Sequence, residues 1–246
     1  MKHIYKETYR IRSNEIDING NARLDAIANL LQEAAGNHAK KLQFDITDLH
    51  DSNHTWILHQ LHIKMDRYPE WRDQITIETW PSSGDRLRAY RDFRILDLNK
   101  TELGVALTHW LIIDLNKRRP VRIPQEILDL GLDSANHVIP INSSKSPDYN
   151  GKVIKSAEFT VHHSDLDLNK HLNNTVYVRW LIDTIPTKYL IAKNFRELHV
   201  NFKSEAALND LVLSELGNLT DNSYFFRLTR KKDDGIIANG EFTLFN

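Results

Sequence analysis

The pattern of apolar and polar positions predicts one long helix and several strands in the first half of the chain. From Arg23 to Leu42, apolar residues recur every three or four positions, which is typical of an amphipathic helix with one buried face. Other stretches alternate apolar and polar residues with the period of a half-buried strand. We expect these strands at residues 3–12, 55–66, 73–80, 86–98 and 105–115. In the strand at 55–66, the face expected to be buried carries Ile57, Leu61, Ile63 and Met65.

The second half of the chain shows the same order of elements. A strand is expected at 152–163, a polar loop at 164–172 and a helix at 173–190, with Pro186 near its end. Further strands are expected at about 196–204, 210–217, 223–231 and 236–245. Between the halves, residues 116–150 contain four prolines and a Ser-Ser-Lys-Ser run, which predicts a linker with one short helix near 124–130.

The two halves also match residue by residue, which indicates an internal duplication. A shift of 150 residues places Glu15 on Asp165, Asp17 on Asp167, Asn19 on Asn169 and Asn21 on His171. Further along, a shift of 137 residues aligns Leu61-His62-Ile63 with Leu198-His199-Val200 and Asp73 with Asp210. We therefore predict a tandem α+β fold with domains at 1–115 and 151–246, joined by the linker 116–150. In each domain a curved antiparallel sheet wraps round one long helix.

The two copies differ at two positions that bear on chemistry. Where the second copy has His171, the first has Asn21, and where the second has Glu205, the first has Tyr68. An acid paired with a histidine therefore exists in one copy only, and we assign any catalysis to the second half.

Residues 164–174 form the part of the chain richest in candidate chemistry, and three interpretations compete. The Asp165-x-Asp167-x-Asn169 pattern resembles the start of a calcium-binding loop, but Lys170 and Val176 stand where that loop requires Gly and Glu. Helix capping explains the pair Asn173 and Asn174 well. It does not explain the rest of the loop.

The third interpretation of this loop is hydrolysis. A helix N-terminus offers free backbone N–H groups to an oxygen on which negative charge develops. In an extended loop, the alternate residues Asp167, Asn169 and His171 point the same way. A general base for water has to come from elsewhere in the chain.

Composition excludes several other classes of function. The formal net charge of -1 provides no general attraction for nucleic acid or an anionic membrane, and no apolar stretch approaches the length of a membrane span. The chain has no cysteine, which excludes disulfides, thiolate metal sites and a cysteine nucleophile. The 12 histidines show no paired ligand spacing, so we expect no zinc and no cofactor. No apolar leader precedes the first strand, and we expect a cytoplasmic protein.

Three stretches resemble the acyl-acyl-carrier-protein thioesterases, the double-hotdog enzymes of plants and bacteria that end fatty-acid synthesis. Residues 165–174 with Tyr177 and Trp180 are similar to the family's signature. Residues 116–124, with Trp110 shortly before them, look like its basic segment. Residues 202–205, which read Phe-Lys-Ser-Glu, resemble the strand that carries its catalytic glutamate.

The resemblance implies hydrolysis of fatty acyl-acyl-carrier-protein thioesters, with Asp167, Asn169, His171 and Glu205 as the catalytic set. Many plant members carry a cysteine after the glutamate, and this chain has Ala206 there, so attack by activated water remains. By hypothesis, Glu205 and His171 orient and deprotonate the water, and Asn169 holds Glu205, the thioester or both. Asp167 fixes the loop, and backbone N–H groups near Asn173 and Asn174 take the oxyanion.

The resemblance also suggests a role for the first hotdog and a partner. With no catalysis of its own, the first hotdog is expected to bind the acyl chain. The candidates, each equally explicable as core, are Leu24, Ile27, Leu31, Trp56, Leu58, Ile75, Ile77 and Trp110. Acyl carrier protein is acidic and needs a basic docking surface. Two clusters qualify, namely Arg86, Arg88, Arg91 and Arg94, and Lys117, Arg118, Arg119 and Arg122.

Rival functions stay open at this level: a hotdog acyl-CoA thioesterase, a dehydratase, and a non-catalytic acyl-binding protein. A monomer and a homodimer are both compatible with two hotdogs in one chain.

Overall fold

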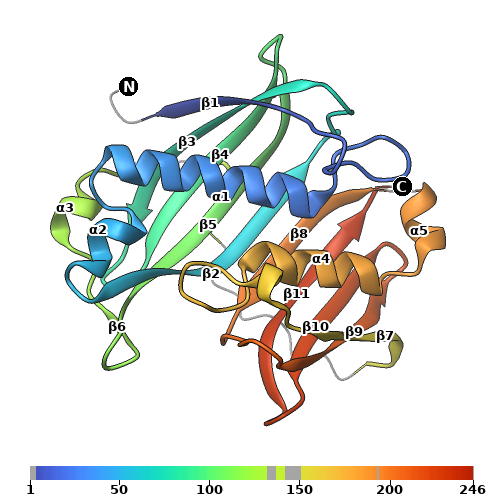
Figure 1. The fold of residues 1–246 in the computed structure, drawn as a ribbon. Coiled ribbons are helices and arrows are strands. Elements are labelled where there is room, and N and C mark those ends of the chain that lie inside the picture. Colours follow the sequence, from blue (N-terminus) through green and yellow to red (C-terminus); the bar gives the residue numbers. More distant parts are fainter. Residues whose placement is uncertain (1–3, 132–136, 142–150, 193, 246) are drawn as a thin grey trace. The chain divides into compact units, whose positions relative to one another are not determined.

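The computed structural model describes residues 4–131, 137–141, 151–192 and 194–245, and it confirms an α+β chain. The chain divides into two compact units, Met1–Asn142 and Ser143–Asn246. The first unit therefore continues past residue 115, where its end was expected, and the boundary lies within the stretch expected as a linker. The two units are described separately below (Figure 1).

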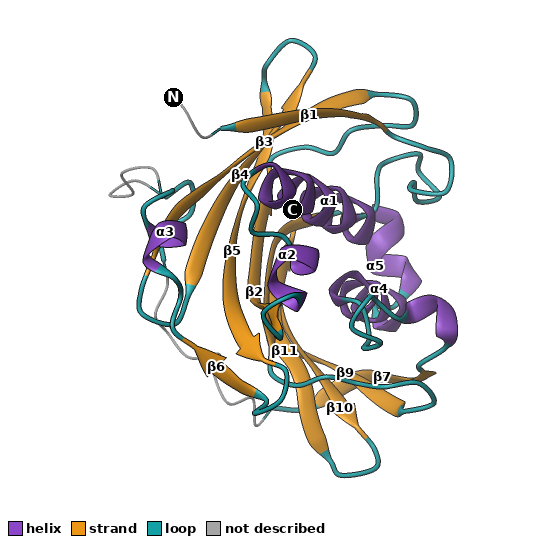
Figure 2. Cartoon of the chain, turned by 60° about the vertical axis from the view of Figure 1, so that its left-hand side comes forward, coloured by secondary structure: helices purple, strands orange, loops and turns teal. Residues whose placement is uncertain are grey.

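The first unit is an antiparallel sheet that curves round a long helix (Figure 2). Helix α1, Leu24–Lys41, confirms the expected helix, and its buried face includes Ile27, Leu31 and His38. The sheet has the order β1-β3-β4-β5-β2, with β6 paired to β5. Its strands are β1 Tyr5–Arg10, β2 His54–Met65, β3 Gln74–Gly84, β4 Ala89–Asp97, β5 Glu102–Asp114 and β6 Arg119–Val121.

Two short helices complete the first unit. Helix α2, Ile46–His50, was not predicted, because five residues are too few to show a helical period; Asp45 and Asp48 form a capping box at its start. Helix α3, Gln125–Leu128, confirms the short helix expected near 124–130. Its Ile127 packs with Ile112 of β5 and with Ile123. This part of the expected linker is therefore bound to the first unit.

The buried face of β2 differs from the prediction at one end of the strand. Leu61, Ile63 and Met65 are buried as expected, but at the other end Leu58 is buried in place of Ile57. The pairing of β2 with β5 shifts between Leu58 and Gln60. A bulge of this kind adds one residue to the strand and reverses which face each side chain takes.

Residues 137–141 cover part of the sheet of the first unit on β4 and β5. Ile139 is buried against Tyr90 and Leu107. His137 Nδ1 lies 2.8 Å from the fully buried Asp92 Oδ2, and Nε2 lies 3.1 Å from Ser83 Oγ. The Val138 N–H donates to the other oxygen of Asp92. Both oxygens of Asp92 bind this segment. We therefore interpret the Ser83–His137–Asp92 contacts as structural, since they fix residues 137–141 on the sheet, and not as a catalytic triad.

The second unit repeats the arrangement with a shorter helix. Its sheet has the order β8-β11-β10-β9-β7, and helix α4 lies against β7 and β9 (Figure 1). The strands are β7 Val153–Thr160, β8 Phe195–Phe202, β9 Leu211–Thr220, β10 Ser223–Arg230 and β11 Gly235–Leu244. A 3-10 turn, η1 His163–Asp165, precedes the polar loop.

The helix expected over 173–190 is two helices, α4 Asn174–Thr184 and α5 Thr187–Ala192. The break is caused by Pro186. A residue that precedes proline disfavours the helical conformation, and Ile185 is extended. Among the residues with described positions, no helix has both the length and the apolar character needed to cross a bilayer.

Candidate functional site

The polar loop before α4 is held in shape by Asp167. Its Oδ1 accepts the backbone N–H groups of Asn169, at 2.8 Å, and of His171, at 3.2 Å. The backbone N–H of Asp167 donates in turn to the carbonyl oxygen of His171, at 2.8 Å. Lys170 takes a positive φ of 63°, which closes the turn. This is the loop-fixing geometry expected for Asp167.

The loop at residues 15–23 repeats this hydrogen-bond pattern at a shift of 150 residues. Asp17 Oδ1 accepts the N–H groups of Asn19, at 2.8 Å, and Asn21, at 2.9 Å. Gly20, at the position of Lys170, also has a positive φ. Matching buried acids, Glu15 and Asp165, each accept the N–H three residues earlier. The predicted repeat is confirmed here at the level of single hydrogen bonds.

Glu205 lies in a second loop, after β8, that is bonded to the first. The Leu172 N–H donates to the carbonyl oxygen of Ala206, at 2.9 Å. The first unit has the equivalent bond, from the Ala22 N–H to the carbonyl oxygen of Pro69, at 2.8 Å. The backbone that brings the two loops together is therefore common to both copies.

In the second unit these loops bring His171 and Glu205 together. His171 Nε2 lies 3.3 Å from Glu205 Oε2, and the two side chains are 29% and 32% exposed. Water can therefore reach a pair that can exchange a proton. Asn169 is half-buried in the same loop as His171. The first unit has Asn21 and Tyr68 at the corresponding positions.

Helix α4 begins at Asn174, three residues after His171. Asn173 is the helix cap, and its side-chain oxygen accepts the Thr175 N–H at 3.0 Å. This confirms the capping interpretation for Asn173, while Asn174 is the first residue of the helix. Leu168 does not anchor the loop, since this residue is 76% exposed, and Ile18 is similarly exposed in the first loop.

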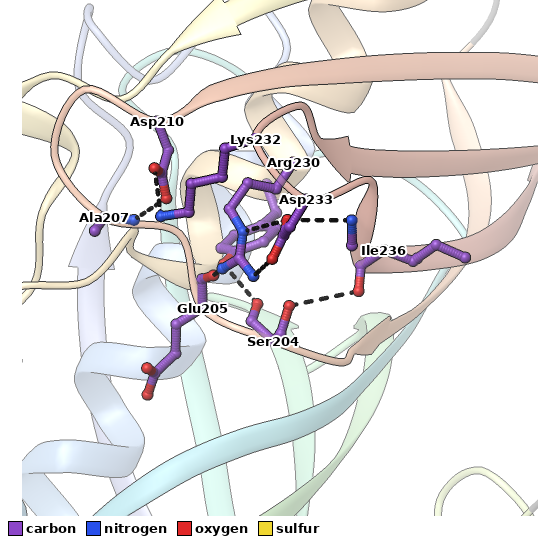
Figure 3. Close-up of polar contacts among 10 residues, drawn as sticks. Ser204, Glu205, Ala207, Asp210, Arg230, Lys232, Asp233 and Ile236 are labelled. Carbon is purple, nitrogen blue, oxygen red and sulfur yellow. Dashed lines mark hydrogen bonds and ion pairs between the residues drawn. The ribbon is translucent and has the colours of Figure 1, made fainter.

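Four further groups hold the segment that carries Glu205, and sequence reasoning missed their role. The Tyr177 hydroxyl of α4 donates to the carbonyl oxygen of Ser204, at 3.2 Å. The Arg230 guanidinium, at the end of β10, donates to the carbonyl oxygen of Glu205 and pairs with Asp233. Figure 3 shows the carboxylate of Glu205 pointing away from Arg230. Asp210 Oδ2 accepts the Ala207 N–H at 2.9 Å.

Electrostatics favour the charged forms around this segment. The hydrogen bond from Arg230 lowers the pKa of Asp233 to about 2. Burial alone would raise the pKa of Asp210, but the Ala207 N–H and the Lys232 ammonium outweigh burial, and the pKa falls below its ordinary value. Burial raises the pKa of Tyr177, so its hydroxyl keeps the proton that it donates.

The substrate-binding candidates of the first unit lie on its helix and sheet. Leu31 is fully buried on α1 as part of the core. Trp110 is half-buried on β5, where its ring packs edge-on against Trp56 and its indole N–H donates to Thr108. Arg118 and Arg119 are exposed where β5 turns into β6.

The arginine cluster on and beside β4 is not the free basic surface that was considered. Arg88 pairs with Asp85, and Arg94 pairs with Glu102. Arg91 is directed towards α1, where Nη1 contacts His38 Nδ1 at 3.0 Å. Burial lowers the pKa of Arg91 to about 10. In the second basic cluster, Lys117 pairs with Asp114, with Nζ 3.4 Å from Oδ2.

In the described part of the chain, no three or more Asp, Glu or His side chains come together in a way that could hold a metal ion. What the site can do is acid–base chemistry. A histidine and a carboxylate in contact can take a proton from water and return it to a leaving group.

Comparisons with known proteins identify the family. Residues 2–130 match the acyl-ACP thioesterase N-terminal domain and residues 150–243 match the C-terminal domain. The chain is 31% identical over 225 residues to an oleoyl-acyl carrier protein thioesterase of Coriandrum sativum, and this match covers 85% of the chain and 61% of the relative. A relative from Arabidopsis thaliana with a similar name is 30% identical, with 92% and 66% covered. The chain thus spans about two thirds or less of the length of these relatives.

Solved structures give the fold. An acyl-ACP thioesterase from Bacteroides thetaiotaomicron superposes with a TM-score of 0.88 at 24% identity, covering 98% of both chains. A 12:0-ACP thioesterase from Umbellularia californica gives 0.87 at 21% identity, covering 98% of this chain and 97% of the other. The chain has the predicted double-hotdog fold. Together with the family match over both halves, this makes the chain a member of the acyl-ACP thioesterase family.

Proposed function

We propose that the protein hydrolyses fatty acyl-acyl-carrier-protein thioesters with water activated at His171 and Glu205. The observation that carries this proposal is the 3.3 Å contact between His171 Nε2 and Glu205 Oε2 beside the start of α4. Such a pair occurs in one copy of a duplicated fold whose other copy keeps the same loop backbone. Relatives named as acyl-carrier-protein thioesterases support the choice of substrate.

In the proposed reaction, the water oxygen attacks the thioester carbonyl carbon while the Glu205–His171 pair takes one proton from the water. Asn169 positions the thioester or Glu205, and the backbone N–H of Asn174, the first residue of α4, stabilises the oxyanion. The N–H groups on either side of it already donate, from Asn173 to the carbonyl oxygen of Asp165 and from Thr175 to the Asn173 side chain. The tetrahedral intermediate then collapses, the carbon–sulfur bond breaks, and the proton passes to the leaving thiolate. The products are a free fatty acid and the carrier thiol. A cysteine nucleophile plays no part, since the chain has none.

The first hotdog is proposed to bind the acyl chain. Burial of a methylene contributes roughly 0.8 kcal/mol, so an apolar slot between helix and sheet would hold a fatty chain tightly. Leu31 and Trp110 are the candidates proposed for its walls. Asn173 and Asn174 are proposed to meet the thioester end of the substrate.

A thiol-release assay tests the proposed function. With acyl carrier protein carrying chains of several lengths, a thiol reagent should report stoichiometric release of carrier thiol together with free fatty acid. A dehydratase would change the acyl chain without releasing thiol, and an acyl-binding protein would bind without turnover. Either of these results would reject the proposal. If the protein hydrolysed acyl-CoA faster than acyl-acyl carrier protein, the proposed substrate would change to acyl-CoA.

The basic turn between β5 and β6 is proposed as the docking surface for acyl carrier protein. Reversal of charge in the double variant Arg118→Glu/Arg119→Glu should raise KM for the carrier-bound substrate about 10-fold, because the carrier is acidic. KM for an acyl-CoA of the same chain length should change less. Steady-state kinetics on both substrates measure the difference, and Arg10→Glu, at an exposed arginine of β1, serves as a single charge reversal elsewhere on the first unit. Equal changes for the two substrates would rule out docking at this turn.

The location and assembly of the protein are also proposals. We propose a cytoplasmic monomer or homodimer, while the plant relatives are named as chloroplastic. Sedimentation of the purified chain distinguishes the two assembly states.

A further inference from the structure

The backbone that carries Glu205 is held at three successive carbonyl oxygens, each by a different part of the second unit. The Ser204 carbonyl accepts from Tyr177 of α4, and the Ala206 carbonyl accepts from the Leu172 N–H of the histidine loop. Between them, the Glu205 carbonyl accepts from Arg230 at the end of β10. One residue on, the Ala207 N–H is held by Asp210. Rotation of the peptide groups on either side of Glu205 would break at least one of these bonds.

Some of these bonds also occur in the first unit, which has no glutamate at this position. The Leu172–Ala206 bond has its equivalent between Ala22 and Pro69. The Asp210–Ala207 bond has its equivalent between Asp73 Oδ2 and the Glu70 N–H, at 2.9 Å. These two bonds therefore belong to the fold itself.

Among the described residues of the first unit, those at the positions of Tyr177 and Arg230 cannot donate the corresponding bonds. The residue 150 positions before Tyr177 is Ile27, which is fully buried and has no hydroxyl group. The residue equivalent to Arg230 follows from the strand pairing. Arg230 pairs with Val212, whose equivalent 137 residues earlier is Ile75, and Ile75 pairs with Asp97. Asp97 therefore stands at the position of Arg230. Both donors thus belong only to the copy that carries the glutamate. In the first unit Asp97 instead pairs with Arg67, the residue 137 positions before Ser204, so that copy joins the same two segments through side chains and leaves the backbone carbonyl out.

We propose that Arg230 and Tyr177 are positioning residues that act through Glu205, an inference that rests on the proposed role of Glu205 as the base. Asp233 holds Arg230 in place. Its two carboxylate oxygens accept hydrogen bonds from the arginine Nε, at 2.9 Å, and Nη2, at 2.5 Å. The guanidinium is therefore held on one side and donates on the other (Figure 3). Tyr177 is 3% exposed, and its ring packs edge-on against Phe202.

The variants Arg230→Met and Tyr177→Phe test this inference. Each should lower kcat about 10-fold or more and leave KM within about 3-fold, because a small displacement of the base impairs the chemical step more than binding. Arg230→Lys, which keeps the charge but loses the fork that meets Asp233, should fall between wild type and Arg230→Met. Tyr177→Phe keeps the buried ring and decides the question if Arg230→Met does not fold.

Arg227→Met is the matched control for Arg230→Met. Arg227 lies on the same strand and pairs with Glu215 through Nε at 3.0 Å and Nη2 at 2.7 Å. Its substitution therefore also removes an ion pair made by two guanidinium nitrogens of β10. It should leave kcat within about 2-fold. An equal loss in Arg227→Met and Arg230→Met would overturn the inference, because the effect would then come from the strand as a whole.

A double-mutant cycle with Glu205→Gln separates positioning from a general structural role. If Arg230 and Tyr177 act through Glu205, their substitutions should lower the residual rate of Glu205→Gln by less than about 2-fold. A further 10-fold loss in that background, or an unchanged kcat in the single variants, would overturn the inference. If Glu205→Gln itself keeps the wild-type kcat, the proposed role of Glu205 fails first, and the inference fails with it.

Discussion

Glu205→Gln should lower kcat for acyl-acyl-carrier-protein hydrolysis by about 10²- to 10⁴-fold, the usual contribution of a general base. The amide keeps the size of the side chain but cannot take a proton from water. KM should change little, because the acyl chain and the carrier are proposed to bind elsewhere. Single-turnover and steady-state measurements of thiol release give the two constants separately.

The control for Glu205→Gln is Glu158→Gln. Glu158 is a half-exposed acid of β7 that pairs with Lys231, and its substitution should leave kcat unchanged. His171→Ala should cost about as much as Glu205→Gln, and the double variant little more, because the two groups act as one unit. If Glu205→Gln kept a near-native kcat with an unchanged melting curve, water activation at this pair would be excluded.

Gly240→Ala should lower the free energy of unfolding by about 3 kcal/mol or more, the upper range for overpacking a well-packed interior. A Cβ at this position would lie 1.9 Å from the carbonyl oxygen of His199 and 2.8 Å from the ring of Phe226. The nearer atom is backbone of the neighbouring strand β8, which cannot rotate away. Denaturant unfolding of the purified chain measures the change.

Gly36→Ala is the matched control for Gly240→Ala. Gly36 lies on the exposed side of α1, and a Cβ there would meet nothing within 4 Å. Alanine in a helix should raise the stability by up to about 1 kcal/mol. Both substitutions restrict the unfolded chain equally, so the difference between them isolates the contact in the folded state. A Gly240→Ala variant as stable as wild type would show that β8 and β11 can move apart.

Local periodicity predicts the main helices and strands of this chain and much of their buried faces, but it does not show where a distant segment or an irregular pairing changes which residues are buried. The bulge at Leu58–Gln60 buries Leu58 in place of Ile57, and no residue type in that strand predicts the bulge. In β5, four successive residues are buried, namely Ala106, Leu107, Thr108 and His109. Both faces of the strand are covered there, because segment 137–141 packs on the side on which Leu107 lies. The contacts that decide both cases come from residues far away in the sequence.

The candidate site was predictable to the extent that the two copies could be compared. Asn21 against His171 and Tyr68 against Glu205 predict which copy carries chemistry, and these assignments stay predictions until tested. Tyr177 against Ile27 is a signal of the same kind, readable from the same shift of 150 residues. The contact of Arg230 could not be predicted in this way. Its hydrogen bond goes to the backbone carbonyl of Glu205, and the sequence pattern carries no information about such a bond.

The matching backbones of the loops at 15–23 and 165–173 bear on whether a catalytic pair could be introduced in the first unit. The first loop already has the turn, the aspartate and the helix start that a second active site would need. His and Glu could be introduced at Asn21 and Tyr68 without a new backbone. The hydroxyl of Tyr177, however, corresponds to Ile27, which is 0% exposed, and a phenol ring there would overpack the core of the first unit. With a core residue at this position, giving the first unit the proposed chemistry would mean rebuilding its interior, so the proposed division of labour between the copies would be hard to reverse.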